Sequence, residues 1–116
     1  KLESIPKEIF QLTNLMVLNL SCNKISWIPE EINNLFNLKV LELGCNKFGS
    51  VPKEIGRLVN LKELYLGSNK IEIVHEKIWE LYNLEILCMC NNMISIIPRE
   101  IKNMNKLKIL KLDGNI

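Results

Sequence analysis

The stretch "LVNLKELYLGSNKI", residues 58–71, decides the fold of this chain. Its leucines are spaced by three, three and two positions, so neither the period of a helix nor that of a strand holds throughout. Residues 64–66 alternate as a short strand does, with Tyr65 outward between two inward leucines. The Gly, Ser and Asn at residues 67–69 are typical of a turn, in which the Asn amide can bond to the backbone. The stretch therefore predicts a short strand followed by a tight turn.

The spacing of this stretch recurs along the chain with a constant period of 23 residues. One coil of this length cannot bury its own leucines, whereas stacked coils with parallel strands about 4.8 Å apart share one core. Parallel strands joined by such crossovers are expected to wind right-handed. The columns that keep the period are Leu12, Leu35, Leu58, Leu81 and Met104; Leu15, Leu38, Leu61, Leu84 and Leu107; Leu18, Leu41, Leu64, Leu87 and Leu110; Leu20, Leu43, Leu66, Met89 and Leu112; and Asn23, Asn46, Asn69, Asn92 and Asn115.

The Asn column is predicted to be structural. The amide of an interior Asn has to be hydrogen-bonded, and a ladder of amides along the stack can satisfy the backbone of successive turns. We therefore assign these residues to the scaffold and not to a binding site. They are Asn23, Asn46, Asn69, Asn92 and Asn115.

The period divides a single domain, residues 1–116, into full and partial units. Neither end has a recognisable cap, and the chain starts with Lys1 and not with Met. We therefore expect either a fragment of a longer array or ends that meet another copy in an end-to-end homodimer. The units are a partial repeat at 1–11, full repeats at 12–34, 35–57, 58–80 and 81–103, and a partial repeat at 104–116.

The strand half of each unit reads "LMVLNLSCN", "LKVLELGCN", "LKELYLGSN", "LEILCMCNN" or "LKILKLDGN". These motifs resemble the L-x-x-L-x-L-x-x-N pattern of the leucine-rich repeat family. In "ISWIPEEI", "FGSVPKEI" and "ISIIPREI" a Pro is followed three residues later by Ile, which is similar to the 23-residue repeats of Ras-suppressor and Ras-associated scaffold proteins. His75 replaces this Pro in "IEIVHEKI" and is expected to weaken one turn. The resemblance implies an α/β solenoid with five short parallel strands on a concave face and loop or 3-10 return segments on the convex face.

The concave face is the candidate binding site, because its side chains form a regular, rigid array. Four of the five residues in one outward column are aliphatic, although the leucine pattern imposes nothing there. Beside Tyr65 and charged residues they form an apolar strip with a polar rim, as a protein-binding surface does. The alternative explanation is that β-branched residues suit exposed strand positions. The candidate partner-binding residues are Val17, Val40, Glu63, Ile86 and Ile109 in this column and Asn19, Glu42, Tyr65, Cys88 and Lys111 in the next.

A second candidate surface lies on the rim of the coils. Trp27, Ile73 and Ile96 occupy a position that is Ser in other units, so the stack does not require apolar side chains there. Trp79 occupies a similar rim position in its unit. A partner could cover these residues, but packing of the convex loops explains them equally well.

The cysteine and histidine positions argue against a catalytic or metal site. Cys22 and Cys45 share one column, whereas Cys88 and Cys90 point the same way on a strand about 14 Å from Cys22, so the four thiols cannot share a zinc ion. Reduced, intracellular thiols are expected, with a Cys22–Cys45 disulfide as the alternative. His75 lies on the return segment, away from Cys88, so no nucleophile–base pair forms. No phosphate-binding loop or metal-ligand spacing occurs, and we expect no enzyme, no cofactor and no metal.

Charge and hydropathy bear on the class of partner. The 15 Lys and Arg residues are interleaved with 13 Asp and Glu residues, which gives a net charge of +2 without the basic block of a nucleic-acid-binding protein. No apolar run approaches the roughly 18 residues of a membrane span. We therefore expect a non-enzymatic, cytoplasmic module for protein–protein interaction, and the resemblance implies partners in small-GTPase signalling. The alternatives are a secreted or surface protein contacting another organism's proteins, a regulatory repeat segment of a larger enzyme, and a structural spacer.

Overall fold

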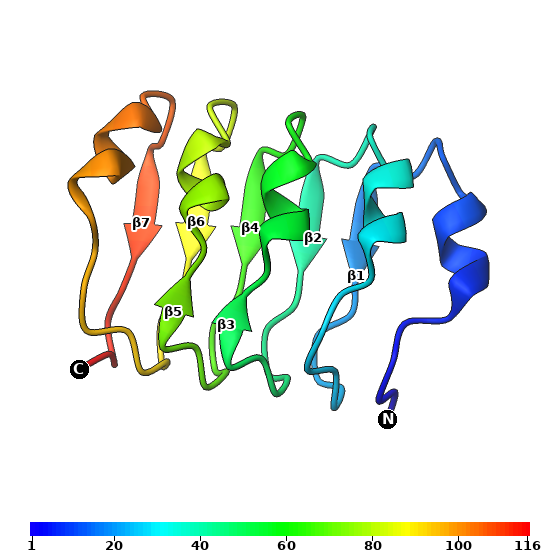
Figure 1. Cartoon of the computed structure of the whole chain (residues 1–116), viewed down its shortest axis with the longest axis horizontal. Coiled ribbons are helices and arrows are strands. Elements are labelled where there is room, and N and C mark those ends of the chain that lie inside the picture. Colours follow the sequence, from blue (N-terminus) through cyan, green and yellow to red (C-terminus); the bar gives the residue numbers. More distant parts are fainter.

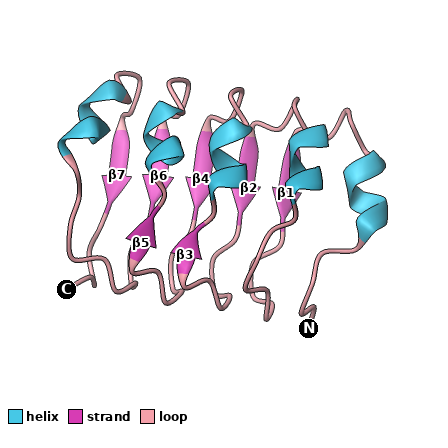
Figure 2. Ribbon diagram, in the orientation of Figure 1, coloured by secondary structure: helices cyan, strands magenta, loops and turns pink.

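The computed structural model covers residues 1–116 and shows a solenoid whose coils stand side by side along one axis, with the two termini at opposite ends (Figure 1). Each coil has a strand on one side and a 3-10 helix on the other, joined by turns and loops (Figure 2). The strands are β1 (Val17–Asn19), β2 (Val40–Glu42), β3 (Ser50–Val51), β4 (Glu63–Tyr65), β5 (Ile73–Val74), β6 (Ile86–Cys88) and β7 (Ile109–Lys111). The 3-10 helices are η1 (Lys7–Gln11), η2 (Glu30–Asn34), η3 (Lys53–Arg57), η4 (Glu76–Glu80) and η5 (Arg99–Asn103). The predicted α/β solenoid is confirmed.

Five of the strands form one parallel sheet in the order β1-β2-β4-β6-β7. The register pairs each residue with the one a full repeat later, as Leu41 pairs with Leu64. The predicted row of inward leucines from Leu18 to Leu110 is therefore continuous. Leu110 is nevertheless 40% exposed, because β7 is the edge strand and no further coil covers it. The prediction of an interior position is wrong for this last residue of the row.

Each 3-10 helix is preceded by a residue with extended backbone, whose ψ lies between 133° and 159°. In four coils this residue is Pro, whose restricted φ and missing N–H suit the start of a helix. His75 takes the place of Pro in one coil with a φ of −62°, and its Nδ1 accepts a hydrogen bond from the backbone N–H of Lys77 at 3.2 Å. The turn expected to be weaker therefore keeps the same shape and has a side-chain cap.

The turn after each strand of the five-stranded sheet passes through the left-handed region of backbone conformation. Steric crowding makes this region costly for L-residues, and small or polar residues are tolerated there best. Cys22 and Cys45 are free thiols at these positions, so the turn geometry explains their column. The φ angles are 58° at Cys22, 54° at Cys45, 57° at Ser68, 54° at Asn91 and 74° at Gly114.

The return side carries a second, two-stranded sheet that the sequence analysis does not predict. Strands β3 and β5 pair in parallel, Ser50 with Ile73 and Val51 with Val74. Stacked coils bring their extended return segments to strand spacing, and β-branched residues favour extended backbone. The coils are therefore joined by strand pairing on both sides at this point of the stack.

The core contains 27 buried apolar residues drawn from successive coils. Trp79 belongs to it with 2% of its surface exposed, so it is a core residue and not a rim residue, and packing rather than a partner explains it. Helix η4 turns this indole into the core, as η1 does with Phe10 at the equivalent position. Trp27 is exposed, as expected for the rim.

Gly56 lies where η3 and η4 approach each other closely on the return side. A Cβ at this position would lie 2.7 Å from the Cβ and 2.8 Å from the carbonyl carbon of Lys77 in η4. We expect Gly56→Ala to lower the free energy of unfolding by about 1 to 3 kcal/mol, because the backbones of η3 and η4 have to separate. Urea unfolding followed by circular dichroism measures the change. Gly49→Ala is the control, since no atom lies within 4 Å of its added Cβ, and equal losses in both variants would contradict this account.

Candidate functional site

The candidate site is the outward side of the five-stranded sheet, which we call the strand face. The strand register places the ten predicted partner-binding residues on it in two adjacent columns. The leucine between the two columns is buried in β1, β2, β4 and β6, whereas its neighbours on either side are exposed or half-buried. One column consists of Val17, Val40, Glu63, Ile86 and Ile109, and the other of Asn19, Glu42, Tyr65, Cys88 and Lys111.

The first column is an apolar strip with a charged residue at its centre. Val17 and Val40 lie on one side of Glu63, and Ile86 and Ile109 lie on the other. Val17 is 55% exposed, which leaves its side chain open to a partner. Aliphatic residues held at strand spacing on a rigid sheet offer a surface that can be covered without reordering the backbone.

The second column is partly fixed by hydrogen bonds between neighbouring side chains. The Tyr65 hydroxyl donates to Oε2 of Glu63 at 2.8 Å, and the amide of Asn19 donates to Oε2 of Glu42 at 3.0 Å. The hydrogen bond to Glu63, followed by burial, raises the pKa of Tyr65 to about 12. Tyr65 is therefore a neutral hydroxyl with a restrained ring at the centre of the strand face, flanked in register by Glu42 and Cys88.

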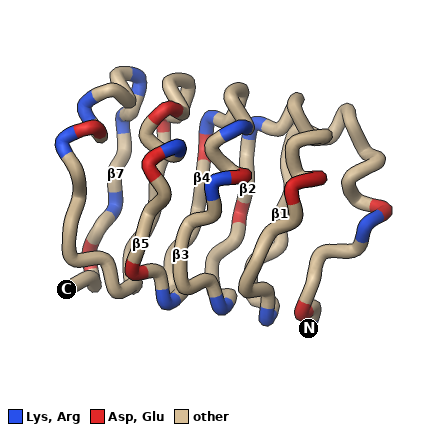
Figure 3. The backbone as a smooth tube through the Cα atoms, viewed as in Figure 1, with Lys and Arg blue, Asp and Glu red and all other residues tan.

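Charges of both signs surround this surface. Lys108 contacts Glu85 at 3.0 Å beside the apolar strip, and this ammonium lowers the pKa of the Glu85 carboxyl. Figure 3 shows Lys and Arg interspersed with Asp and Glu along the coils. The charged residues that border the strand face are therefore of both signs.

Two cysteines on the strand face contact each other. The Sγ atoms of Cys88 and Cys90 are 3.1 Å apart, and both residues are half-buried free cysteines. Their hydrogen bond, together with burial, raises the pKa of the Cys90 thiol. The sequence spacing places the two on the same side of the strand, but the direct contact between the sulfur atoms comes from the structure.

The Asn column forms a continuous set of hydrogen bonds between neighbouring coils. Each side-chain oxygen accepts from a backbone N–H of the preceding coil, as Oδ1 of Asn46 does from Ile25 at 2.9 Å. The amide nitrogen donates to carbonyls of its own turn, and in Asn46, Asn69, Asn92 and Asn115 also to the preceding coil. These amides replace backbone partners that the turn leaves unpaired, and they lie apart from the strand face.

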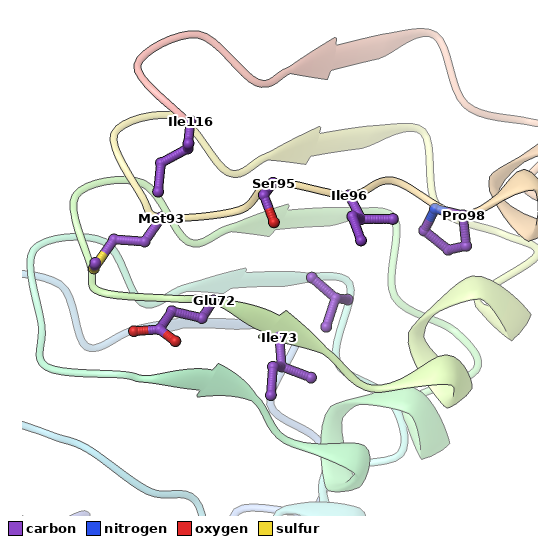
Figure 4. A pocket seen from close by; sticks show the side chains of 8 residues that line it. Glu72, Ile73, Met93, Ser95, Ile96, Pro98 and Ile116 are labelled. Carbon is purple, nitrogen blue, oxygen red and sulfur yellow. The ribbon is translucent and has the colours of Figure 1, made fainter.

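The second candidate surface lies on the return side. Ile73 and Ile96 are 67% and 77% exposed and line an open hollow of about 650 Å³ together with Met93 and Ile116 (Figure 4). Trp27 lies at a separate hollow near the N-terminal end. The three rim residues of the sequence analysis are thus exposed, but they do not line one common cavity.

Neither a metal site nor a membrane-spanning helix occurs in the structure. No three side chains among His, Cys, Asp and Glu are grouped so that they could hold a metal ion. None of the helices has the length and apolar character needed to cross a bilayer. His75 lies at the N-terminus of η4, and the thiol of Cys88 lies on β6 in the five-stranded sheet.

The geometry defines a class of protein, a solenoid of short coils with a five-stranded parallel sheet along one side. Sequence comparison assigns the family: a model described as "Leucine-rich repeat region" matches residues 30–115, and a single "Leucine Rich Repeat" model matches residues 14–35. The chain belongs to the leucine-rich repeat family. No curated protein sequence matches it.

Solved structures with this fold come from bacteria and plants. They include a leucine-rich repeat protein of Leptospira interrogans, with 39% identity and a TM-score of 0.93. Internalin C2 of Listeria monocytogenes has 28% identity and a TM-score of 0.81. The ectodomain of the receptor kinase GASSHO1/SCHENGEN3 of Arabidopsis thaliana, in complex with Casparian strip integrity factor 2, has 33% identity and a TM-score of 0.85. The alignments cover 99%, 94% and 97% of this chain but only 29%, 46% and 14% of those chains, respectively.

Proposed function

We propose that this chain is a non-catalytic protein-binding module that holds its partner on the strand face. The observation that carries the proposal is the apolar strip beside Tyr65, whose hydroxyl is already bonded to Glu63 at 2.8 Å. A restrained aromatic ring beside half-buried and exposed aliphatic side chains is the composition found at the centre of protein interfaces. The Arabidopsis receptor ectodomain, solved in complex with an integrity factor, supports a binding role for the same fold.

Each group of residues has a separate role in this proposal. Val17, Val40, Ile86 and Ile109 supply apolar area, and Tyr65 is the aromatic anchor. The polar and charged residues set register and specificity, because unpaired charges at an interface exclude wrong partners. These residues are Asn19, Glu42, Glu63 and Lys111.

The proposals on the class of partner and on cellular location rest on the resemblance of the Pro-containing repeats to known repeat proteins. A partner in small-GTPase signalling and a cytoplasmic location follow from the similarity to Ras-suppressor and Ras-associated scaffold repeats. The end-to-end homodimer, the secreted alternative and the regulatory segment of a larger enzyme stay predictions. Purification of the partner tests the first of these proposals, since a GTPase partner would bind in a nucleotide-dependent manner, whereas light scattering at high concentration tests the homodimer.

The test of the binding proposal is a matched pair of double variants. Tyr65→Ala with Ile86→Lys alters the strand face, whereas Tyr82→Ala with Val59→Lys makes equivalent changes at exposed positions outside both candidate surfaces. Proteins captured from a native lysate by the unaltered chain are identified, purified and titrated by calorimetry. We expect the strand-face variant to lose at least about thirtyfold in affinity, equivalent to about 2 kcal/mol, because it removes central anchors.

The control variant is expected to bind as the unaltered chain does. Circular dichroism has to show equal unfolding midpoints for both double variants, so that a loss of binding reports on the surface alone. If a purified partner binds the strand-face variant with unchanged affinity, the proposal fails and a spacer role gains support.

A further inference from the structure

The contact between Cys88 and Cys90 is not required by the repeat. The equivalent positions in the other coils carry Asn, Glu, Tyr or Lys in the column of Cys88 and Ser, Gly or Asp in the column of Cys90. The left-handed turn that explains Cys22 and Cys45 does not involve these two residues, because Asn91 holds that position in their coil. A separate explanation is needed for two thiols in one coil of the strand face.

The neighbouring coil provides the space that the thiol pair occupies. Gly67 lies beside it, and a Cβ at Gly67 would be 3.0 Å from the Sγ of Cys90 and 3.7 Å from the Sγ of Cys88. A side chain in that place would crowd the Sγ of Cys90 and lie in ordinary van der Waals contact with the Sγ of Cys88. The pair therefore lies in a gap left by a glycine of the adjacent strand segment, open to the strand face.

The two sulfur atoms lie near bonding distance. Bonded sulfur atoms are about 2.05 Å apart, so the pair at 3.1 Å has to close by only about 1 Å. Strand β6 ends at Cys88 and the chain reverses at Asn91 with a φ of 54°, so Cys90 lies where the extended backbone gives way to the turn. Both side chains are half-buried, which leaves the sulfur atoms within reach of a small reagent.

We propose that Cys88 and Cys90 form a redox-active dithiol that low-molecular-weight disulfides convert into an intrastrand disulfide. One cysteine thiolate attacks the reagent disulfide, forms a mixed disulfide and releases one reagent thiolate. The second cysteine thiolate then attacks the cysteine sulfur of the mixed disulfide, forms the Cys88–Cys90 bond and releases the second reagent thiolate. The protein loses two electrons and two protons, and the reagent disulfide becomes two thiols.

The two steps differ in speed because the second is intramolecular. A resolving sulfur held 3.1 Å away acts at a very high effective concentration, so we expect the mixed disulfide to be resolved before it accumulates. The hydrogen bond with Cys88, together with burial, raises the pKa of the Cys90 thiol and so lowers the fraction of Cys90 that is thiolate. The bond closes only a very small loop and faces solvent, so an added dithiol reagent is expected to reopen it.

The consequence for binding rests on the proposed function. Cys88 lies in register between Tyr65 and Lys111, so oxidation alters the strand face beside its aromatic anchor. The chemistry itself needs no partner. A failed thiol experiment therefore leaves the binding proposal intact, and a failed binding experiment leaves the dithiol intact.

The test uses the full chain with Cys22→Ser and Cys45→Ser, which removes the two exposed turn thiols. This variant is incubated with glutathione disulfide, quenched in acid and analysed by intact-mass spectrometry. The expected product is lighter than the reduced chain by two hydrogen atoms and has no free thiol. The matched control adds Cys90→Ser and is expected to accumulate at least about tenfold more glutathione adduct, because its mixed disulfide cannot be resolved.

Circular dichroism checks that both variants are folded, and dithiothreitol should restore the reduced mass of both. A chain with both cysteines that accumulates glutathione adducts to the level of the control would overturn the proposal. A disulfide-linked dimer in place of the lighter monomer would overturn it as well.

Discussion

Leu64→Ala is expected to lower the free energy of unfolding by about 3 to 5 kcal/mol, which is the range for deleting a wholly buried leucine side chain. Leu64 lies in the central strand of the five-stranded sheet and has no exposed surface. Its register partners, Leu41 and Leu87, are also fully buried, so the truncation leaves a cavity bounded on both sides. Urea unfolding followed by far-ultraviolet circular dichroism measures the loss.

Leu110→Ala is the matched control, since it deletes the same atoms from the same row of leucines. Leu110 lies in the edge strand and is already partly in water, so less apolar surface is lost and the gap is open to solvent. We expect a loss below about 1.5 kcal/mol. Equal losses at the two positions would mean that the coils do not share one core, and the solenoid account of stability would be wrong.

Asn46→Leu is expected to cost about 2 to 4 kcal/mol, because a buried polar partner is removed while the backbone groups remain. Oδ1 of Asn46 is the acceptor for the N–H of Ile25, which lies in a fully buried residue. The amide donates to the carbonyls of Leu20 at 2.9 Å and Leu43 at 3.1 Å. Leucine offers neither an acceptor nor a donor, so the N–H of Ile25 is left buried and unpaired.

The carbonyls are affected less than the N–H. Leu20 also accepts from Asn23, and Leu43 also accepts from Asn69, so each carbonyl keeps one amide of the column. The cost therefore stays below that of three orphaned groups. Asn34→Leu, on the exposed surface of η2, is the control and is expected to change the free energy of unfolding by less than about 0.5 kcal/mol. An unchanged urea midpoint in Asn46→Leu would show that the hydrogen bonds of the Asn column do not stabilise the fold.

The repeat made the scaffold predictable from the sequence. A constant period forces equivalent residues into register, so the pairing of Leu41 with Leu64 and of Glu42 with Tyr65 follows from their spacing alone. The strand face was predictable for the same reason, because alternation along a strand assigns every second residue outward. The failures occur where the period says nothing about depth: Trp79 lies in the core, whereas Leu12 and Leu110, near the two ends of the stack, are exposed.

The candidate site was predictable as a surface but not as a set of contacts. Sequence spacing placed Tyr65 and Glu63 on one side of a strand, whereas the hydrogen bond between them depends on the rotamers that their neighbours allow. The β3–β5 pairing likewise needed the return segments of two coils to reach strand spacing. No local sequence pattern in either segment predicts this strand pairing.

The sequence by itself determined the period, the strand register, the inward leucine rows and the Asn column, because each follows from repeating one backbone unit at a constant length. Only the tertiary structure shows which side chains are in contact between the stacked coils. It buried the indole of Trp79, bonded the Tyr65 hydroxyl to Glu63 and brought the thiols of Cys88 and Cys90 together beside Gly67. The physical reason is that such contacts depend on the space that neighbouring coils leave and not on the period that positions them.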